Sequence, residues 1–206
     1  MDKILIPARR GSKGWANKNR KLLRYTLEAL DEESRAKTTI LTNDAVIEHQ
    51  AHLYGVSSEY RADTSERDTS SVLEAIKPHC KDMDKDTVIT MLYLTYPYRT
   101  MKDIRSVWQY WNDRQPESLL CRKKPKTHPY LCITDVDLMD RGDQLITHGL
   151  YRRQDYPEVW EITHFVSMFR VSEIRKLNGN CYNSETAFFL LDEKYMTNDI
   201  DSEDDL

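Results

Sequence analysis

The segment KILIPARRGSKGWANKNRKLL, residues 3–23, decides the fold. It opens with a short apolar run that ends at Pro7, which is typical of a buried strand because proline cannot donate to the ladder. The loop that follows, from Ala8 to Lys21, has six basic side chains and no acidic one. Gly11 and Gly14 permit positive φ angles there, and leucines at helical spacing come next. This order predicts a phosphate-binding loop at a helix N-terminus.

A basic loop with two glycines is also common as a solvated connection. The loop has neither the G-x-x-x-x-G-K-[ST] pattern of P-loops nor the G-x-G-x-x-G pattern of dinucleotide-binding folds. Composition alone therefore leaves both a phosphate cradle and a plain surface loop open.

Six further β-rich or apolar runs alternate with helical patterns over much of the chain. The run at 87–94, TVITMLYL, is apolar on both faces, which is typical of a central strand of a parallel sheet. The pattern predicts an α/β fold with a mostly parallel Rossmann-like sheet and flanking helices. The turn Asp140-Arg141-Gly142-Asp143 allows a small antiparallel hairpin at 130–151. Strands are expected at 38–42, 56–60, 87–94, 118–124, 163–169 and 186–191, and a short helix at 171–177.

Ligands of open parallel sheets bind beyond the carboxyl ends of the strands. The loop Thr95-Tyr96-Pro97-Tyr98-Arg99 follows the expected central strand and should therefore lie at the ligand site. Thr100 with Asp103, and Ser71 with Glu74, have the spacing of helix capping boxes.

The chain has 206 residues, a net charge of −4 and 39% hydrophobic residues, which fits one globular domain over residues 1–206. It contains no apolar run near eighteen residues and no leader pattern, so we expect a cytoplasmic protein that does not insert into membranes. Its mild acidity argues against a nucleic-acid partner. The four cysteines lack C-x-x-C spacing, which predicts reduced thiols rather than a zinc site or disulfides.

Two acidic residues near the end of the chain, Asp199 and Asp201, flank Ile200. In an extended chain both carboxylates fall on one face while the isoleucine faces the core. Mg²⁺ takes one or two carboxylates together with phosphate oxygens, so a magnesium site is one reading and a solvated acidic tail is the other. Asp135 and Asp137 have the same spacing inside the expected hairpin and rank below. His49 and His52 lie three apart on an expected helix and are interpreted as surface residues.

The segment IPARRGSKGWANKNRKLL resembles the N-terminal signature I-P-A-R-x-G-S-K-G-x-x-x-K-N-x-K-x-L of the sugar-acid cytidylyltransferases, the CMP-sialic acid synthetase family. Further stretches resemble the family in its order along nearly the whole chain. These are the polar loop at 61–71, TYPYRTMKDI at 95–104, RRQDYP at 152–157 and NDIDSEDD at 198–205.

The resemblance implies a nucleotidyltransferase that transfers CMP from CTP to a nonulosonic, sialic-type sugar acid, releases pyrophosphate and requires Mg²⁺. It further implies a homodimer in which residues 125–160 form an excursion for dimerisation or for covering the substrate. The nucleotide-binding positions that it implies are Ala8, Arg9, Gly11, Ser12, Lys13, Lys18, Asn19, Arg61, Asp68, Ser71, Thr95 and Arg99. The implied sugar-binding positions are Tyr93, Thr95, Arg152, Arg153 and Gln154. The implied catalytic positions are Arg9, Lys13, Lys18 and Asp201, and the implied metal ligands are Asp199 and Asp201.

Several positions depart from the family pattern, among them Leu94 and Tyr96, which stand where the family has proline and serine. Tyr93 stands where the family has a glutamine that helps to hold the sugar acid, and Thr163 and His164 stand where it has Asn-Gly. These departures keep three alternatives open: a non-catalytic nucleotide-binding descendant, a D-x-D metal-dependent glycosyltransferase, and a nucleotidyltransferase for another base or sugar.

Overall fold

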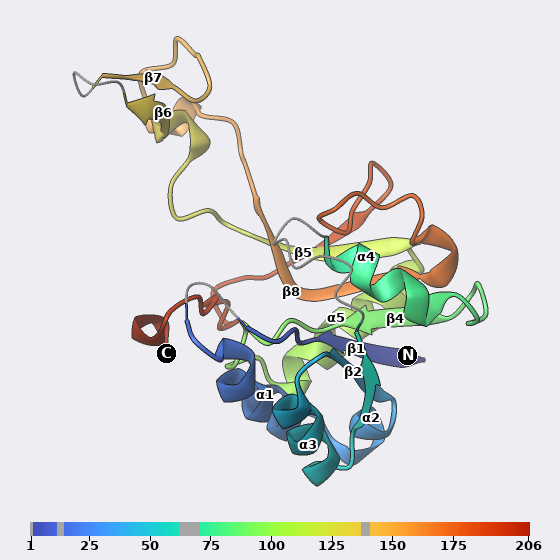
Figure 1. Cartoon of the computed structure of the whole chain (residues 1–206). Helices are drawn as coiled ribbons and strands as arrows, with labels where there is room; N and C mark the ends of the chain where they lie inside the picture. Colours follow the sequence, from blue (N-terminus) through green and yellow to red (C-terminus); the bar gives the residue numbers. More distant parts are fainter. Residues whose placement is uncertain (1, 12–14, 62–70, 137–140) are drawn as a thin grey trace.

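The computed structural model describes residues 2–11, 15–61, 71–136 and 141–206. Within these residues, seven strands form one sheet in the order β3-β2-β1-β4-β8-β5-β9 (Figure 1). They are β1 (Lys3–Pro7), β2 (Thr38–Thr42), β3 (Ser57–Tyr60), β4 (Val88–Met91), β5 (Ser118–Lys123), β8 (Glu161–Arg170) and β9 (Ala187–Leu190). The pairs β1–β2, β2–β3, β1–β4 and β5–β9 are parallel, whereas β8 is antiparallel to both of its neighbours. The predicted α/β class with a mostly parallel sheet is confirmed.

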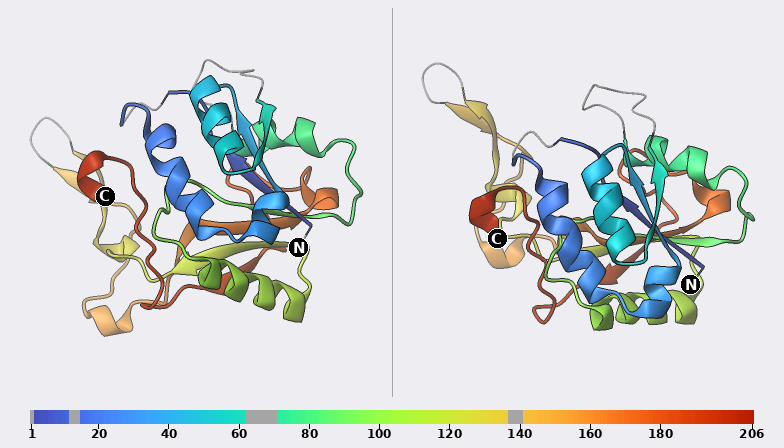
Figure 2. Two further views of the ribbon diagram at one scale, coloured as in Figure 1. Left: turned by 90° about the horizontal axis from the view of Figure 1, so that it is seen from below. Right: turned by 60° about the horizontal axis from the view of Figure 1, so that its bottom comes forward.

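Side-chain alternation along β1 assigns the two faces of the sheet. Ile4 and Ile6 belong to one hydrophobic cluster, and Leu5 belongs to the other. Helices α1 (Lys18–Ala29), α3 (Ala45–Leu53) and α5 (Met101–Arg114) bury apolar side chains in the first cluster. Helix α4 (Val72–Ile76) and the 3-10 helix η1 (Lys77–Cys80) pack into the second (Figure 2). In the described part of the chain no helix combines the length and the apolar character that crossing a bilayer demands.

The helix ends follow the capping residues of the sequence. At the start of α5, Thr100 Oγ1 accepts from the Asp103 N–H at 3.3 Å and Asp103 Oδ2 accepts from the Thr100 N–H at 2.8 Å, which is the predicted capping box. At the start of α4, Ser71 Oγ accepts from the Glu74 N–H at 3.4 Å.

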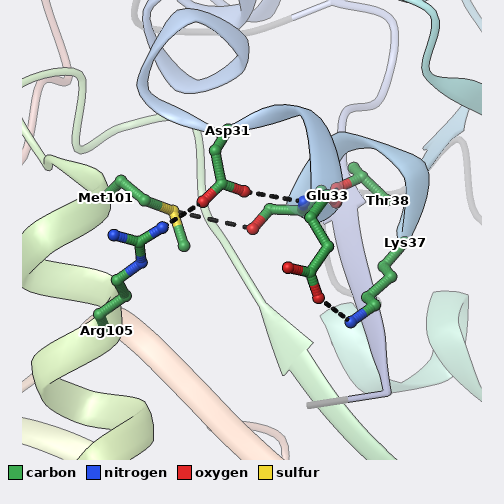
Figure 3. Close-up of polar contacts among 7 residues, drawn as sticks. Asp31, Glu33, Lys37, Thr38, Met101 and Arg105 are labelled. Carbon is green, nitrogen blue, oxygen red and sulfur yellow. Dashed lines mark hydrogen bonds and ion pairs between the residues drawn. The ribbon is translucent and has the colours of Figure 1, made fainter.

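A short helix, α2 (Glu32–Ala36), is tied to α5 by surface contacts (Figure 3). Asp31 accepts from the Ser34 N–H at 2.9 Å and pairs with Arg105 at 2.5 Å. The Ser34 hydrogen bonds, aided by Arg105, hold the pKa of the Asp31 carboxyl below its ordinary value. Lys37 and Glu33 form an i,i+4 pair at 2.7 Å. Such exposed pairs contribute little to stability individually.

The predicted helix at 171–177 is wrong. The chain forms only a 3-10 turn there, η4 (Val171–Glu173). Helices in proteins are stabilised mostly by the packing of an apolar face, and a turn can bring two apolar side chains to the core as well. The buried side chains of Ile174 and Leu177 reach the second cluster from irregular turns instead.

Residues 125–160, called the arm below, leave the sheet after β5 and return at β8. The arm carries the 3-10 helices η2 (Pro129–Leu131) and η3 (Arg153–Asp155) and the antiparallel strands β6 (Ile133–Val136) and β7 (Gly142–Gln144). The predicted antiparallel hairpin is confirmed, and it projects from the body of the protein (Figure 1). Stacking of Tyr130 on His148, with ring centroids 4.2 Å apart, joins the segments of the arm on either side of β6 and β7.

Strand β8 is irregular where it passes the end of β4. Its register against β5 shifts between Leu119 and Cys121, so that Leu119 faces Met168 but Cys121 faces Thr163. Such bulges re-aim side chains beside functional sites. The buried Arg99 guanidinium donates to the carbonyl oxygen of Phe165 inside this irregular stretch and to that of Tyr93 at 3.0 Å. Arg99 therefore joins the end of β4 to the bulge of β8.

Arg99→Met should destabilise the fold, because it leaves two buried carbonyl oxygens without donors. We expect the free energy of unfolding to fall by about 2–4 kcal/mol in urea denaturation. Arg105→Met is the matched control, since it removes an exposed guanidinium and should cost less than about 1 kcal/mol. Equal losses in the two variants would contradict the clamp role of Arg99.

Candidate active site at the carboxyl edge of the sheet

One edge of the sheet collects the chain segments that carry the predicted site. In the described sheet β8 alone runs in reverse, so the carboxyl ends of β1, β4, β5 and β9 meet the start of β8 at the same edge. The loop after β1, the loop after β4, the base of the arm and the C-terminal segment from residue 191 all begin here. From β1 the chain continues to β2 and from β4 to β5, which lie in opposite directions along the sheet. This reversal between β1 and β4 is a topological switch point, where ligands of such sheets bind.

The loop after β1 is anchored on both sides. The buried Ala8 donates its N–H to the carbonyl oxygen of Leu41 at 2.9 Å, and the Arg10 N–H donates to Asn43 Oδ1 at 2.6 Å. Gly11 has a φ of 76°, in the left-handed region that favours glycine. Two of the predicted phosphate ligands, Ser12 and Lys13, lie outside the described residues.

Helix α1 begins with positive charge at its positive end. Asn17 caps it in a left-handed conformation, with φ of 59°, and its first turn contains no acidic residue. Lys18 and Lys21 lie in the first turn instead, although cations are disfavoured beside a helix N-terminus. An anion between the loop and this helix end would relieve that repulsion. Asn19 does not point to this space, because its Nδ2 donates to the Arg9 carbonyl oxygen at 2.9 Å and so holds the loop.

The C-terminal segment crosses back to the same helix end. Asp201 Oδ1 pairs with Lys18 Nζ at 2.8 Å, and Glu203 pairs with Lys21 at 3.4 Å. The Lys18 side chain is 13% exposed and that of Asp201 is 80% exposed. The partially buried lysine therefore presents its charge to an open carboxylate, and the basic loop and the acidic pair lie at one place.

The predicted alternation around Ile200 is confirmed. Ile200 is fully buried, while Asp199 and Asp201 are exposed. The Ile200 N–H donates to the carbonyl oxygen of Thr95 at 2.8 Å, which attaches the segment to the loop after β4. Tyr96, in that loop, donates its hydroxyl to Asp199 Oδ2 at 3.1 Å.

The side-chain carboxylate of Asp205 organises the last residues of the chain. Asp205 Oδ2 accepts from the N–H and Oγ of Ser202 at 2.7 and 2.8 Å and from the Asp201 N–H at 3.1 Å, ahead of the 3-10 helix η5 (Glu203–Asp205). The hydrogen bonds from Ser202 are the main reason that the pKa of Asp205 lies below its ordinary value. A plain solvated tail, the alternative reading of the sequence, does not describe this segment.

Four positions that depart from the family pattern, Tyr93, Tyr96, Thr163 and His164, pack together behind Asp199, the first and last of them half-buried. Tyr93 packs on His164 with ring centroids 4.9 Å apart, and Thr163 Oγ1 donates to the Tyr96 hydroxyl at 2.9 Å. Burial raises the pKa of both tyrosines well above the ordinary value. Burial also lowers the pKa of His164, against the opposing charge of Asp199. His164 Nδ1 lies 3.2 Å from Ser167 Oγ.

A cavity of about 690 Å³ opens beside Asp199 between the base of the arm and the C-terminal segment. Lys123, Lys124 and Lys126 line one side of it, and Glu161, Asp199 and Asp205 supply acidic groups. Lys123 Nζ lies 3.2 Å from Glu161 and 3.5 Å from the Thr197 carbonyl oxygen. The cavity thus has the size and the polar lining for a sugar-sized anion next to the acidic pair.

Other predicted positions lie apart from this edge. Arg153 and Gln154 are on η3 of the arm, and Arg152 immediately precedes it, where its guanidinium pairs with Asp155 at 2.8 Å. Figure 1 places this part of the arm away from the sheet edge. The three exposed side chains therefore do not meet the basic loop of the same chain.

The remaining nucleotide-binding positions have structural contacts. Arg99 is buried as the clamp described above, and burial lowers its pKa to about 10. Ser71 caps α4. Arg61 is buried at the end of β3, where its N–H donates to the Thr42 carbonyl oxygen at 2.9 Å. Asp68 lies outside the described residues, as does Asp137 of the rival D-x-D pair.

No protein-family model matches the chain. Three N-acylneuraminate cytidylyltransferases of Streptococcus agalactiae, from serotypes III, Ia and V, are each 25% identical over 163 residues. The match covers 73% of this chain and 39% of each relative, so the chain spans well under half the length of the curated relatives that it matches.

Two solved structures share the fold. A CMP:2-keto-3-deoxy-manno-octonic acid synthetase, solved with CTP, has a TM-score of 0.67 at 14% identity, and the match covers 98% of this chain and 93% of that one. A cytidylyltransferase from Leptospira borgpetersenii has a TM-score of 0.56 at 18% identity, with 98% and 82% covered. The chain is thus similar to sugar-acid cytidylyltransferases.

Two features of the site were not predicted from the sequence. Lys123 and Lys126 line the cavity, and the basic run after the expected strand at 118–124 was the available signal, since strand ends meet ligands in such sheets. The contact of Tyr96 with Asp199 joins positions 103 apart in the chain, so local sequence carried no signal for it.

The acidic pair fits the cation that the cytidylyltransferase resemblance implies. Asp199 and Asp201 are exposed carboxylates, the hard oxygen donors that Mg²⁺ prefers. Among the described residues no group of three or more His, Cys, Asp or Glu side chains could hold a metal. Two carboxylates completed by phosphate oxygens and water match the usual magnesium site at a nucleotide.

The half-buried His164 should make the stability of the fold depend on pH. Its folded pKa lies below the ordinary 6.5, so the unfolded chain binds the proton first. The free energy of unfolding should therefore fall as the pH drops below about 6.5. In urea titrations at several pH values, His164→Gln should flatten this slope, whereas His49→Gln, at an exposed site on α3, should leave it unchanged. An identical slope in wild type and His164→Gln would overturn the assignment.

Proposed function

We propose that this chain transfers CMP from CTP to a nonulosonic, sialic-type sugar acid and releases pyrophosphate. One contact carries the proposal: Lys18 and Asp201 meet at 2.8 Å although 183 positions separate them. It supports the proposal because the cations that would bind phosphate lie beside the carboxylates that would bind a metal, the combination on which nucleotidyl transfer relies. The names of the relatives, N-acylneuraminate cytidylyltransferases, and of the fold neighbour solved with CTP support the same reaction.

The triphosphate would lie against the loop after β1 and the start of α1. Arg9, Lys13 and Lys18 would neutralise its oxygens, with Ser12 and the backbone around Gly11 as hydrogen-bond donors. Lys18 would exchange Asp201 for a phosphate when CTP binds. Asn19 would support the nucleotide through the Arg9 carbonyl oxygen that it holds at 2.9 Å.

The acceptor would enter the cavity beside Asp199, near Tyr93 and Thr95. Its hydroxyl oxygen would form the new bond to the α-phosphorus in line with the bond to the pyrophosphate oxygen, which breaks. The hydroxyl proton would pass to Asp201, the nearest candidate base. Asp199 and Asp201 would hold Mg²⁺, which would supply charge neutralisation at the phosphate oxygens. The residues thus act mainly by positioning and electrostatics.

The reaction should show itself as pyrophosphate release. We would incubate the protein with Mg²⁺, each of the four nucleoside triphosphates and a panel of nonulosonic and octulosonic acids. We expect release only with CTP and with one acid. Release with another nucleotide would reassign the base. Consumption of a nucleotide sugar without pyrophosphate would indicate a glycosyltransferase. If no pyrophosphate is released but CTP still raises the melting temperature, the chain is a non-catalytic nucleotide-binding descendant.

The matched variants for this assay are Asp201→Asn and Asp204→Asn, two exposed carboxylates of the same segment. Asp201→Asn should lower turnover by about 100-fold or more, as losses of charge-stabilising groups do. Its stability should change by no more than about 1 kcal/mol, because its ion pair is open to solvent. Asp204→Asn should match wild type, and full activity of Asp201→Asn would contradict its role.

We also propose a homodimer in which the arm of one chain supplies Arg152, Arg153 and Gln154 to the site of its partner. The arm exposes large apolar side chains, among them Leu145 at 54% and Tyr151 at 95%. Such a projecting apolar surface is characteristic of an interface. The guanidinium groups would bind the sugar carboxylate.

Sedimentation equilibrium should find a dimer that Leu145→Asp converts to a monomer with an unchanged circular dichroism spectrum. A charge placed in the apolar arm surface would be buried without a partner in the dimer. Leu53→Asp, at an exposed leucine of α3 outside the arm, should remain dimeric. A wild-type monomer at all concentrations would refute the dimer.

A further inference from the structure

A hydroxyl relay connects the protein interior to the first of the two acidic residues. Thr163 Oγ1 donates to the Tyr96 hydroxyl at 2.9 Å, and Tyr96 donates to Asp199 Oδ2 at 3.1 Å. Tyr96 and Thr163 are 4% and 3% exposed, whereas Asp199 lies at the surface. We propose, resting on the function proposed above, that Tyr96 is a positioning residue that fixes the Asp199 carboxylate for a divalent cation.

Further contacts fix both the Tyr96 ring and the backbone next to Asp199. The Tyr96 ring packs edge-on against Phe165, with centroids 5.6 Å apart, and the Phe165 carbonyl oxygen is held by Arg99. On the other side, the Ile200 N–H bonds to the carbonyl oxygen of Thr95, next to Tyr96. The backbone and the side chain of Asp199 are thus both attached to the same loop.

The relay leaves Asp199 free to bind a ligand. Among the described residues Tyr96 is its hydrogen-bond partner, and this bond engages Oδ2, so Oδ1 keeps its lone pairs for a ligand. A tyrosine hydroxyl carries its proton at neutral pH, so Tyr96 acts as a neutral hydrogen-bond donor to Asp199. A neutral donor orients the carboxylate without cancelling its charge, as outer-shell partners of metal ligands do.

Asp201 is held by a different kind of partner. Its partner is Lys18, a cation that a phosphate could take over, and its side chain is 80% exposed. Asp199 is anchored before nucleotide binds, whereas Asp201 becomes available when Lys18 turns to a phosphate. Removing the Tyr96 hydroxyl should therefore weaken cation binding more than it destabilises the fold.

The test measures Mn²⁺ binding by water-proton relaxation, with CTP present, in the full chain and its variants. Tyr96→Phe should weaken binding about 10- to 100-fold, the usual loss when an outer-shell partner is removed. Thr163→Val, which breaks the relay one step earlier, should change affinity in the same direction. The double variant Tyr96→Phe with Asp199→Asn should bind no more weakly than Asp199→Asn alone, because Tyr96 acts through Asp199.

Tyr54→Phe is the control, because it removes a tyrosine hydroxyl that contacts Glu28 at 3.0 Å on the helical surface. It should bind Mn²⁺ as wild type does. Wild-type affinity in Tyr96→Phe, or an additive loss in the double variant, would overturn the relay while pyrophosphate release still supports the proposed function. A wild-type chain that binds no Mn²⁺ with CTP and releases no pyrophosphate would overturn both.

Discussion

The site depends on one buried, positively charged side chain, that of Arg99. Arg99 lies within the sheet edge, donates to the carbonyl oxygens of Tyr93 and Phe165, and has its guanidinium 5.7 Å from the centroid of the Phe165 ring. Burial lowers its pKa to about 10, so the side chain remains charged at neutral pH. A buried charge is tolerated only where its donors are satisfied. The carbonyl oxygens of the β4 end and of the β8 bulge satisfy this one, which fixes both segments where they present side chains to the ligand edge.

The C-terminal segment depends on that fixed edge. It contains no regular strand, yet its central isoleucine is fully buried and its amide bonds to the loop after β4. Lys18 and Lys21 of α1 hold the carboxylates that follow. Specific side-chain contacts thus replace a sheet ladder. A segment held in this way can exchange its partners for a ligand without disturbing the core.

Local patterns predicted the parts of the fold that local physics decides. The strand at 38–42, the capping box at Thr100 and the alternation around Ile200 follow from residue order alone. The burial of Arg99 and the bulge of β8 could not be predicted, because both result from pairing between distant strands. The arm was expected from the resemblance, but the separation of Arg152 and Arg153 from the basic loop is a matter of three-dimensional direction. The helix expected at 171–177 failed because a short apolar pair also packs well from a turn.

The departures from the family pattern lie on one side of the site. The basic loop keeps the signature residues, whereas Tyr93, Tyr96, Thr163 and His164 replace residues behind the acidic pair. They fit one another: Tyr93 packs on His164, and Thr163 bonds to Tyr96. A buried hydroxyl without a hydrogen-bond partner costs about 1–3 kcal/mol of stability, so unrelated substitutions at a decayed site would leave such hydroxyls unpaired more often than paired with one another. Here the buried hydroxyls of Thr163 and Tyr96 are both bonded, and the second ends on Asp199. This mutual fit favours an ordered arrangement behind Asp199 over one that has decayed.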